Sequence, residues 1–392
     1  MEKKTLICVA SLFGLERGFG GIQTHIKWLL RYIEEVGIGY KFISPYNFPH
    51  FIVYPVFAIR YLFKKNLKEF STIWFRYWHY SFLKKVLAAL DKRMDISVIN
   101  CQDPLSALAA LKVKKRYSFS WQVVLTVHMN GSEADEEVKK GHLKQDSWCY
   151  RRIKQIEKQV LSEVDKLVFV SAYAKNEVLK RYPQVNTKKT IIIPNGAGGP
   201  SDLDYSPADS FYSCCCFNLI SIGSLDKIKN HVFLLEVIAN LIPEFPQLRL
   251  FIVGRGELRG FLEKEISRRR LRHCVQIVTL KSQERLLAIL KTAYLNLHCS
   301  LLETSSYSVI EAMSFGIPTV AFSSGGIGEI IRHGRTGFLV EKNDSQTFSH
   351  YVKLLLKDKG LYEKMRCCCR ETFLREFDYR LMGRRYLDFY FS

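Results

Sequence analysis

Short runs of β-branched and other apolar residues alternate with stretches of helical periodicity along most of the chain. Such alternation is typical of βα units with parallel strands rather than of separate β and α parts. Two series of these units can be distinguished. The first predicts strands at residues 5–10, 41–44, 96–100, 122–127, 167–170 and 190–193. The second predicts strands at residues 218–222, 249–253, 275–278, 295–298, 319–322 and 338–340.

The two series are separated by residues 196–213, which are rich in Gly, Pro, Ser and Asp and have no hydrophobic period. Composition of this kind indicates a linker. We therefore predict an α/β protein of two Rossmann-like domains with doubly wound parallel sheets, over residues 1–200 and 214–375. Helical periodicity continues to the end of the chain, and we expect a helix within 376–392 to return to the first domain.

The composition is that of a globular protein with a large core, since 47% of the 392 residues are hydrophobic and 24% are charged. This balance excludes the disordered and fibrous classes. The 58 lysines and arginines outnumber the 38 aspartates and glutamates, which leaves a formal net charge of +20. An excess of this size calls for an anionic partner or substrate.

Basic and aromatic residues are interleaved between residues 48 and 90. They include Lys64, Lys65, Lys68, Lys84, Lys85, Phe57, Tyr61, Phe63, Phe70, Trp74, Phe75, Tyr77, Trp78, Tyr80 and Phe82. A helix on an anionic membrane surface has this composition, and so does a groove for nucleic acid. A third interpretation is an aromatic stripe that faces the core under a solvated basic face. Of the two partners we favour the membrane, and we expect no nucleic acid.

The 11 cysteines do not predict a disulfide framework, because six of them stand in the consecutive triplets 214–216 and 367–369, where pairing geometry is poor. No two C-x2-C motifs have zinc-finger spacing, so we expect no metal site. The expected compartment is a reducing cytoplasm.

The N-terminus carries two lysines before an apolar run, like a secretory signal, but a glycine-rich loop follows instead of a cleavage site, and we predict a buried first strand. The longest other apolar run, residues 51–59, contains Pro55 and is too short for a bilayer, which needs about 20 residues. We therefore expect no transmembrane segment.

Two features of the first domain are candidates for ligand binding. Gly20 and Gly21 precede a helix predicted from Ile22, and the N–H groups of a glycine-rich helix start can bind a phosphate. A plain strand-to-helix turn explains these glycines equally well. His128 follows the strand 122–127, where its ring can bond a sugar hydroxyl or a phosphate oxygen. A buried structural histidine is an equal alternative.

The richest segment follows the strand 295–298 and reads CSLLETSSYSVIEAMSFGIPTV. Glu303 is expected in the loop, and Glu311, eight positions later, about one turn into the next helix. A carboxylate accepts hydrogen bonds from two vicinal ribose hydroxyls, and free N–H groups such as those of Ser306 and Tyr307 bind a diphosphate. The pattern is that of a nucleotide-diphosphate pocket, although two glutamates at this spacing also arise by chance.

These motifs occur in the order seen in glycosyltransferase family 4, which the chain resembles over nearly its whole length. They are the early GG, His128, VSAYAKNEVLKRYP, IPNG, GSLDKIKNH, VGRGEL, ETSSYSVIEAMSFGIPTVAFSSGGIGEII and GRTGFLV. The resemblance implies the GT-B fold, in which two Rossmann-like domains face each other across a cleft. It also implies transfer of a sugar from a UDP- or GDP-linked donor with retention at the anomeric carbon, and no cofactor or bound metal.

The resemblance further implies roles for single residues. Glu311 would bind the donor ribose, and Glu303 the hydroxyls of the donor sugar. Lys229 would neutralise the leaving diphosphate, a task that suits an electrostatic catalyst. Gly21 would approach the phosphate, and His128 would touch the sugar or its phosphate. The other implied donor-binding residues are Gly254, Arg255, Ser306, Tyr307 and Ser308.

The chain departs from the family pattern in two places. Many members have an arginine four or five residues before the lysine, where this chain has Ser224 and its neighbours, so Lys227 or Arg255 would have to supply that charge. The family commonly has glycine after the first glutamate, where this chain has residues 304–306, TSS, whose hydroxyls can bond the donor instead.

The expected protein is thus a retaining hexosyltransferase of bacterial capsule, lipopolysaccharide or glycolipid assembly. Its acceptor would be a saccharide or a lipid-linked saccharide, and it would lie peripherally on the cytoplasmic face of the membrane. Two alternatives remain. One is a nucleotide-sugar epimerase or hydrolase on the same fold. The other is a non-catalytic basic protein that binds membrane or nucleic acid.

Overall fold

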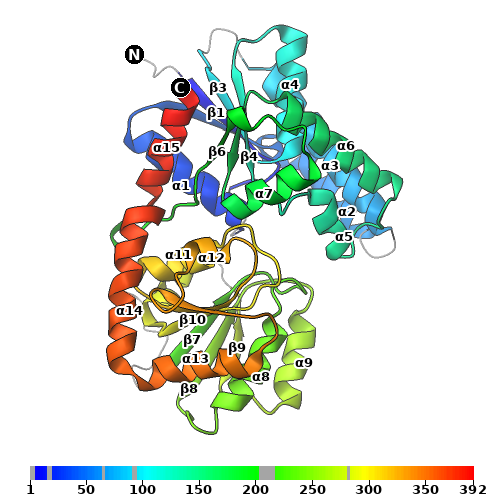
Figure 1. The fold of residues 1–392 in the computed structure, drawn as a ribbon. Coiled ribbons are helices and arrows are strands. Elements are labelled where there is room, and N and C mark those ends of the chain that lie inside the picture. The colour runs from blue at the N-terminus through cyan, green and yellow to red at the C-terminus, as the bar shows by residue number, and fades with distance from the viewer. Residues whose placement is uncertain (1–4, 16–19, 64–66, 91–94, 203–216, 280–282) are drawn as a thin grey trace. The chain divides into compact units, whose positions relative to one another are not determined.

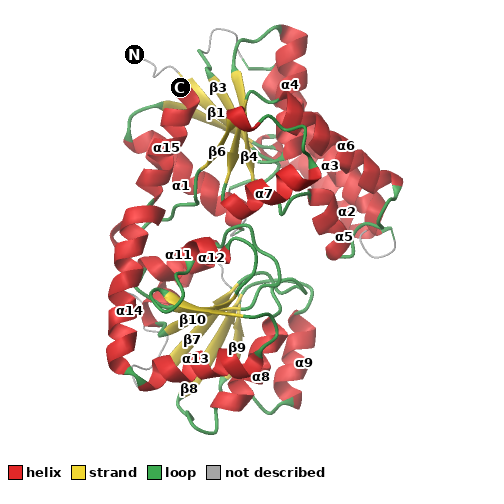
Figure 2. Cartoon of the chain, viewed as in Figure 1, coloured by secondary structure: helices red, strands yellow, loops and turns green. Residues whose placement is uncertain are grey.

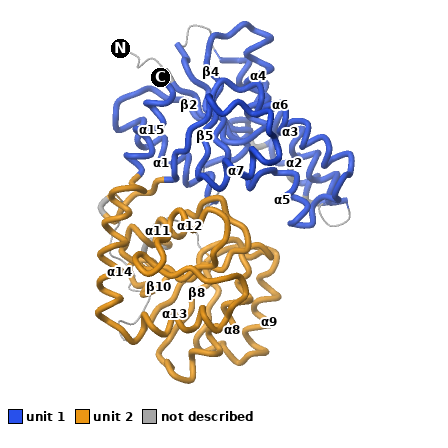
Figure 3. Tube along the Cα trace, viewed as in Figure 1, with its two compact units in different colours: residues 1–195, 379–392 blue, residues 196–378 orange. Residues whose placement is uncertain are grey.

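The computed structural model describes residues 5–15, 20–63, 67–90, 95–202, 217–279 and 283–392. The chain divides into two compact units (Figure 3). Unit 1 comprises Met1–Asn195 and Tyr379–Ser392, and unit 2 comprises Gly196–Asp378. Most of the predicted linker, the cysteine triplet 214–216, Lys64 and Lys65 lie outside the described residues.

Unit 1 is built on a sheet of six parallel strands in the order β2-β1-β3-β4-β5-β6. Figure 2 shows the strands in yellow among the helices of this unit. Its strands are β1 (Thr5–Ala10), β2 (Gly39–Ile43), β3 (Val98–Cys101), β4 (Gln122–Val127), β5 (Lys166–Phe169) and β6 (Thr190–Ile192). The central strands are almost completely buried, as expected of a parallel sheet covered on both faces. The chain passes from β1 to its neighbour β2 and then crosses to β3 on the other side of β1, so the switch point of the sheet lies between β1 and β3.

The helices of unit 1 are α1 (Gly21–Glu35), α2 (His50–Phe63), α3 (Lys68–Ala88), α4 (Pro104–Tyr117), α5 (Glu133–Lys139), α6 (Trp148–Glu163), α7 (Ala172–Arg181) and α15 (Tyr379–Phe391). Several of them begin at a side-chain cap. Asp103, Ser132, Ser147 and Ser171 each accept a hydrogen bond from a first-turn amide. Such caps satisfy helix amides that have no partner within the helix, and they fix where each helix begins after its loop.

The C-terminal helix α15 packs against α1 within unit 1. The Tyr32 side chain of α1 packs against Gly383 of α15, where a Cβ atom would lie 2.2 Å from the Tyr32 ring. Tyr379 and Tyr386 of α15 are fully buried, and the Tyr386 hydroxyl lies 3.2 Å from the Thr126 hydroxyl of β4. The last helix is therefore part of the core of unit 1.

Unit 2 contains a second sheet of six parallel strands, in the order β12-β11-β10-β7-β8-β9. Its strands are β7 (Phe217–Ile222), β8 (Leu248–Val253), β9 (Val275–Val278), β10 (Leu295–His298), β11 (Thr319–Phe322) and β12 (Gly337–Val340). Its helices are α8 (His231–Leu241), α9 (Arg259–Arg268), α10 (Gln283–Thr292), α11 (Tyr307–Ser314), α12 (Ile327–Ile330), α13 (Ser345–Lys357) and α14 (Lys359–Thr372), followed by the π-helical turn η4 (Phe373–Phe377). The switch point lies between β7 and β10.

The predicted α/β class is confirmed, and each predicted strand agrees with an observed strand to within two residues at either end. The agreement has a physical cause, because buried parallel strands are continuous apolar runs that stand out from the amphipathic helices between them. Of the helices in the described part of the chain, none has both the length and the apolar character to cross a membrane.

Candidate active site

The loops after β7 and β10 flank the switch point of unit 2, the place where doubly wound sheets bind their ligands. Lys229 lies in the first loop and Glu303 in the second. A backbone hydrogen bond of 2.8 Å from Leu301 N to Ile228 O joins the two loops. The Lys229 ammonium and the Glu303 carboxylate form an ion pair. The structure thus brings together two of the predicted catalytic residues.

Ser224 has a structural task in the loop that carries Lys229. Its hydroxyl donates a hydrogen bond of 2.6 Å to the Asp226 carboxylate, which also accepts from the amides of Ile228 (2.9 Å) and Lys229 (3.0 Å). These bonds bend the loop into a turn that ends at Asn230, whose φ is 51°. The residue in the usual arginine position therefore shapes the turn that presents Lys229.

The surroundings of Glu303 stabilise its charged form. Burial by itself would raise the pKa of this carboxyl, but Lys229 and His298 outweigh burial and lower the pKa to about 2. His298 Nε2 lies 3.4 Å from Glu303 Oε1. The carboxylate is therefore ionised at neutral pH. His298 is absent from the predicted site, although its position at the carboxyl end of β10 is the same signal that singled out His128.

Glu311 has the opposite electrostatic environment. It lies on α11 and is 9% exposed, and burial raises the pKa of its carboxyl to about 8. No hydrogen bond or ion pair to this carboxyl exists among the described residues. At the start of the same helix, the hydroxyls of Ser306 and Ser308 lie 3.0 Å apart, and Tyr307 is the first helical residue. One segment thus carries a charged glutamate in its loop and a neutral one in its helix.

The loop from Gly254 to Leu258 is joined to the loop of Lys229. Leu225 donates its amide to the carbonyl of Arg255 (2.9 Å), and Leu258 donates to the carbonyl of Leu225 (3.0 Å). A Cβ atom on Gly254 would lie 1.8 Å from the carbonyl oxygen of Gly223, so only glycine fits. The Arg255 side chain is exposed. The two glycine-containing loops therefore form one rigid unit beside the switch point.

The remaining two predicted residues belong to unit 1. Gly21 is the first residue of α1, and the next residue, Ile22, lines a pocket of about 70 Å³ together with His128. The Gln102 amide oxygen lies 2.9 Å from His128 Nε2. Burial, aided by the nearby ring of His25, lowers the pKa of His128 well below its usual value. His128 is thus a neutral ring in the wall of a pocket at the carboxyl end of β4.

The His25 ring packs against His128. No pattern in the sequence singles out His25. The two rings meet edge to face with centroids 5.0 Å apart, and His25 Nδ1 lies 3.0 Å from the side-chain oxygen of Asn195. Burial lowers the pKa of His25 to about 4. Asn195 is 170 positions away in the chain, so no local pattern could have linked the two residues.

The acidic helix α5 forms another wall of the pocket through Glu133 and Glu136. Both carboxylates are held by other groups. Glu136 accepts from the backbone and side-chain amides of Asn130 (2.6 and 3.0 Å), and Glu133 Oε2 lies 3.4 Å from Arg76 Nη2. The pocket therefore presents oriented acidic and neutral polar groups, which suits a ligand rich in hydroxyls.

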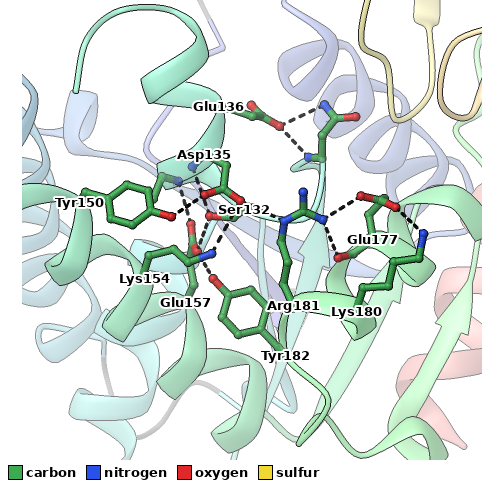
Figure 4. Close-up of polar contacts among 12 residues, drawn as sticks. Ser132, Asp135, Glu136, Tyr150, Lys154, Glu157, Glu177, Lys180, Arg181 and Tyr182 are labelled. Carbon is green, nitrogen blue, oxygen red and sulfur yellow. Dashed lines mark hydrogen bonds and ion pairs between the residues drawn. The ribbon is translucent and has the colours of Figure 1, made fainter. Parts of the chain in front are cut away.

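A polar network behind α5 fixes this helix in place (Figure 4). Asp135 accepts from the Tyr150 hydroxyl (2.8 Å) and from Arg181 Nε (2.9 Å), while Arg181 Nη1 donates to Glu177 (2.7 Å). Glu157, which is 0% exposed, accepts from the Ser132 hydroxyl (2.8 Å), the Ala134 amide (3.1 Å) and the Tyr182 hydroxyl. Helix α5 is thus held at its N-terminal cap by Glu157 and along its first turn by the partners of Asp135.

The buried carboxyl of Glu157 makes the stability of unit 1 depend on pH. Burial raises its pKa to about 7 despite three hydrogen bonds. Because the folded protein holds this proton more tightly than the unfolded chain does, stability should fall by about 2 kcal/mol between pH 5 and pH 7. We expect this fall in the free energy of unfolding between pH 5 and pH 7 to be missing in Glu157→Gln. Urea unfolding of both proteins at several pH values measures it, and equal pH dependence in the two would contradict the assignment.

In the described residues, no group of three or more histidines, cysteines, aspartates or glutamates is arranged to hold a metal ion.

Two family models match the chain. The model described as Glycosyltransferase Family 4 matches residues 19–197, and the one described as Glycosyl transferases group 1 matches residues 217–370. The chain is also 23% identical over 325 residues to a phosphatidylinositol N-acetylglucosaminyltransferase component of Arabidopsis thaliana, covering 80% of this chain and 66% of that protein. The first curated relatives are matched over only 41 to 66% of their own lengths.

Solved structures resemble the whole chain. Sucrose-phosphate synthase from Thermosynechococcus elongatus has a TM-score of 0.75 at 19% identity, and the match covers 98% of each chain. The Anabaena protein HepE, solved in complex with UDP and glucose, has a TM-score of 0.71 at 16% identity, with 99% of this chain and 100% of that chain covered. At these identities the two matches show that this chain has the same fold as the two solved proteins.

Proposed function

Because the chain belongs to the family 4 glycosyltransferases of the GT-B fold, we propose that it transfers a sugar from a nucleotide-diphosphate sugar with retention at the anomeric carbon. We further propose that the acceptor is a saccharide or a lipid-linked saccharide at the cytoplasmic face of a membrane. The observation that carries the donor part is the ion pair of Lys229 and Glu303 at the switch point of unit 2.

The chemistry of these residues supports the proposed reaction. When the bond between the anomeric carbon and the diphosphate breaks, negative charge accumulates on the leaving oxygen. The Lys229 ammonium and the first-turn amides of α11 supply positive charge for the diphosphate. Glu303, held ionised, accepts hydrogen bonds from sugar hydroxyls. We propose that the reaction needs neither a bound metal nor a cofactor.

The acceptor part of the proposal draws on unit 1 and on a relative. The pocket beside His128 has walls of oriented carboxylates and a neutral imidazole, which suit the hydroxyls of a sugar. The name of the Arabidopsis relative gives it a lipid acceptor, phosphatidylinositol. We propose an acceptor of the same general kind, in which a saccharide or polyol is joined to a lipid.

The reaction is tested by product analysis. Purified protein is incubated with UDP- and GDP-linked hexoses, with and without a lipid-linked saccharide extract, and products are identified by mass spectrometry and NMR of the anomeric proton. A glycosylated acceptor with the anomeric configuration of the donor supports the proposal. Conversion of the donor to an epimer, or release of free sugar without any acceptor, would instead identify an epimerase or a hydrolase.

Donor binding is tested on Glu311. Removing a hydrogen-bonded partner of the ribose should weaken nucleotide binding by about 2 kcal/mol, a factor of about 30. Calorimetry with UDP, GDP and ADP on wild type and Glu311→Ala measures the loss. Glu363→Ala, a change at an exposed glutamate of α14, is the matched control. Failure of all three nucleotides to bind the wild type would argue against the proposed donor site.

A further inference from the structure

Helix α2 turns an apolar face to solvent. Phe51 is 77% exposed and Leu62 is 73% exposed, and Pro55 and Ala58 between them are exposed as well. The spacing of these four positions places them on one side of a helix. Tyr54, beside the stripe, is 45% exposed. We call residues 51, 54, 55, 58 and 62 the α2 stripe.

Arg60 is the only residue of α2 among lysine, arginine, aspartate and glutamate, and it faces away from the α2 stripe. Val53 and Val56 are buried, and Arg60 lies on the same side as they do. The Arg60 guanidinium carbon stands 3.8 Å from the centroid of the Phe75 ring on α3. The helix thus has its charge turned inward and its apolar side chains outward, the reverse of an ordinary surface helix. A contiguous exposed apolar face of this kind marks a binding surface.

Helix α3, which packs against α2, adds exposed aromatic residues and positive charge. Phe70 is 45% exposed and Tyr77 is 61% exposed. Arg60 of α2 faces inward and Arg76 of α3 is paired with Glu133. The remaining cations of α3 are Lys68 and Lys85, which are exposed, and Lys84, which is half-buried, against a single acidic residue, Glu69. The surface is therefore both apolar and cationic. That combination fits a bilayer with anionic headgroups, where apolar side chains enter the acyl boundary and lysines lie among the phosphates.

We propose that the α2 stripe is the membrane-docking surface of this protein, inserted shallowly into an anionic bilayer with α3 lying behind it. The inference rests on the proposed function in that it places a lipid-linked acceptor within reach of unit 1. A second copy of the chain is the less suitable occupant, because two surfaces with this positive charge repel each other.

The docking surface is connected to the pocket of unit 1. Figure 1 shows α2, α3, α5 and α6 gathered on one flank of the sheet. Arg76 of α3 pairs with Glu133 of α5, and Glu69 accepts a hydrogen bond of 2.5 Å from the Lys144 amide just beyond α5. Since Glu133 also lines the pocket, a bilayer on α2 holds the helix that forms the pocket wall.

The experiment uses the full chain and vesicles of defined composition. Co-sedimentation is measured at low and high salt with vesicles of phosphatidylcholine alone and with vesicles containing phosphatidylglycerol. The test variant is Phe51→Glu/Leu62→Glu, which alters two exposed positions. The control is Phe261→Glu, at a 50% exposed phenylalanine on α9 of unit 2. Circular dichroism and nucleotide binding check that each variant is folded.

We expect the wild type and the control to bind phosphatidylglycerol vesicles, more strongly at low salt. The double variant should partition at least about tenfold more weakly. It should keep its nucleotide affinity and its turnover with a water-soluble acceptor while losing turnover with a lipid-linked one. Wild-type protein that ignores anionic vesicles, or a double variant that binds them normally, would overturn the inference. So would a dimer in ultracentrifugation that the double variant abolishes.

The same measurements separate this inference from the proposed function. A protein that transfers sugar to a soluble acceptor but does not bind vesicles would remain a glycosyltransferase without this docking surface. A protein that binds vesicles through α2 but binds no nucleotide and transfers no sugar would retain the docking surface and lose the proposed function.

Discussion

Replacement of Lys229 by methionine should lower the turnover number by about 10²- to 10³-fold, the usual effect of removing one group that stabilises transition-state charge. In the wild type the ammonium is already held at the switch point by Glu303 and by the turn at Asp226. It therefore needs little reorganisation when a diphosphate leaves. Steady-state kinetics with the donor identified by binding measure the loss.

Two control variants separate chemistry from folding. Lys227→Met changes an exposed lysine of the same loop, the alternative source of charge for the diphosphate. We expect a smaller loss of turnover from it, because Lys229 and not Lys227 forms the ion pair with Glu303. A larger loss with Lys227→Met than with Lys229→Met would move the diphosphate contact to Lys227. Removal of Lys229 also leaves Glu303 buried without its ion pair, which destabilises the protein. Lys229→Met/Glu303→Gln should recover that stability without recovering turnover, whereas recovery of both would show that Lys229 has only a structural role.

Glu303 was suggested by its place after a recognisable strand, whereas Lys229 was implied by the family resemblance, and the structure brings the two side chains into contact. Both residues follow apolar strands that are easy to recognise, and the carboxyl ends of parallel strands meet at one edge of a sheet. Local order along the chain therefore places both loops at one edge of the sheet, and the strand order, with β7 next to β10, brings them side by side. The same reasoning extends to His298, the last residue of β10, which a consistent use of the rule would have included.

Contacts between residues that are far apart in the chain could not be predicted from the sequence. His25 lies in the second turn of α1, and its contacts with His128 and Asn195 depend on how α1, the end of β4 and the segment after β6 come together. The charge state of Glu311 is of the same kind, since its raised pKa comes from burial and burial depends on the whole surroundings. A glutamate eight residues after another carries no sign of which one will lose its proton.

The region from residue 48 to 90 shows a different limit of prediction from sequence. Periodicity groups residues onto one face of a helix, but it does not say whether that face meets the core or the solvent. The residues of α2 are mostly apolar all round, so an inward aromatic stripe and an outward membrane face were equally consistent with the sequence. Only the structure shows that Arg60 faces α3 while Phe51 and Leu62 face outward.

The affinity for the donor nucleotide should rise about 50-fold between pH 6 and pH 8 and then level off. Burial raises the pKa of the ligand-free Glu311 carboxyl to about 8, so most of the protein carries a proton there at pH 7. If Glu311 accepts hydrogen bonds from the two ribose hydroxyls, as proposed, binding favours the carboxylate and the proton must leave. Well below pH 8 each unit of pH therefore changes the apparent affinity about tenfold, and the change becomes smaller as the pH approaches the pKa of about 8.

Calorimetry at pH 6, 7, 8 and 9 in two buffers with different ionisation enthalpies measures both the affinity and the protons released. Glu311→Gln is the matched control, because its amide cannot ionise while the phosphate groups of the nucleotide titrate as before. The difference between the two proteins in how steeply the affinity changes with pH is therefore caused by the ionisation of Glu311. Since a carboxylic acid that stayed protonated would donate to the ribose instead of accepting from it, equal slopes with no proton release would mean that Glu311 binds the donor as a neutral acid. A slope of opposite sign would show that binding takes up a proton, and the donor would then have to be held by a different arrangement of the residues around α11.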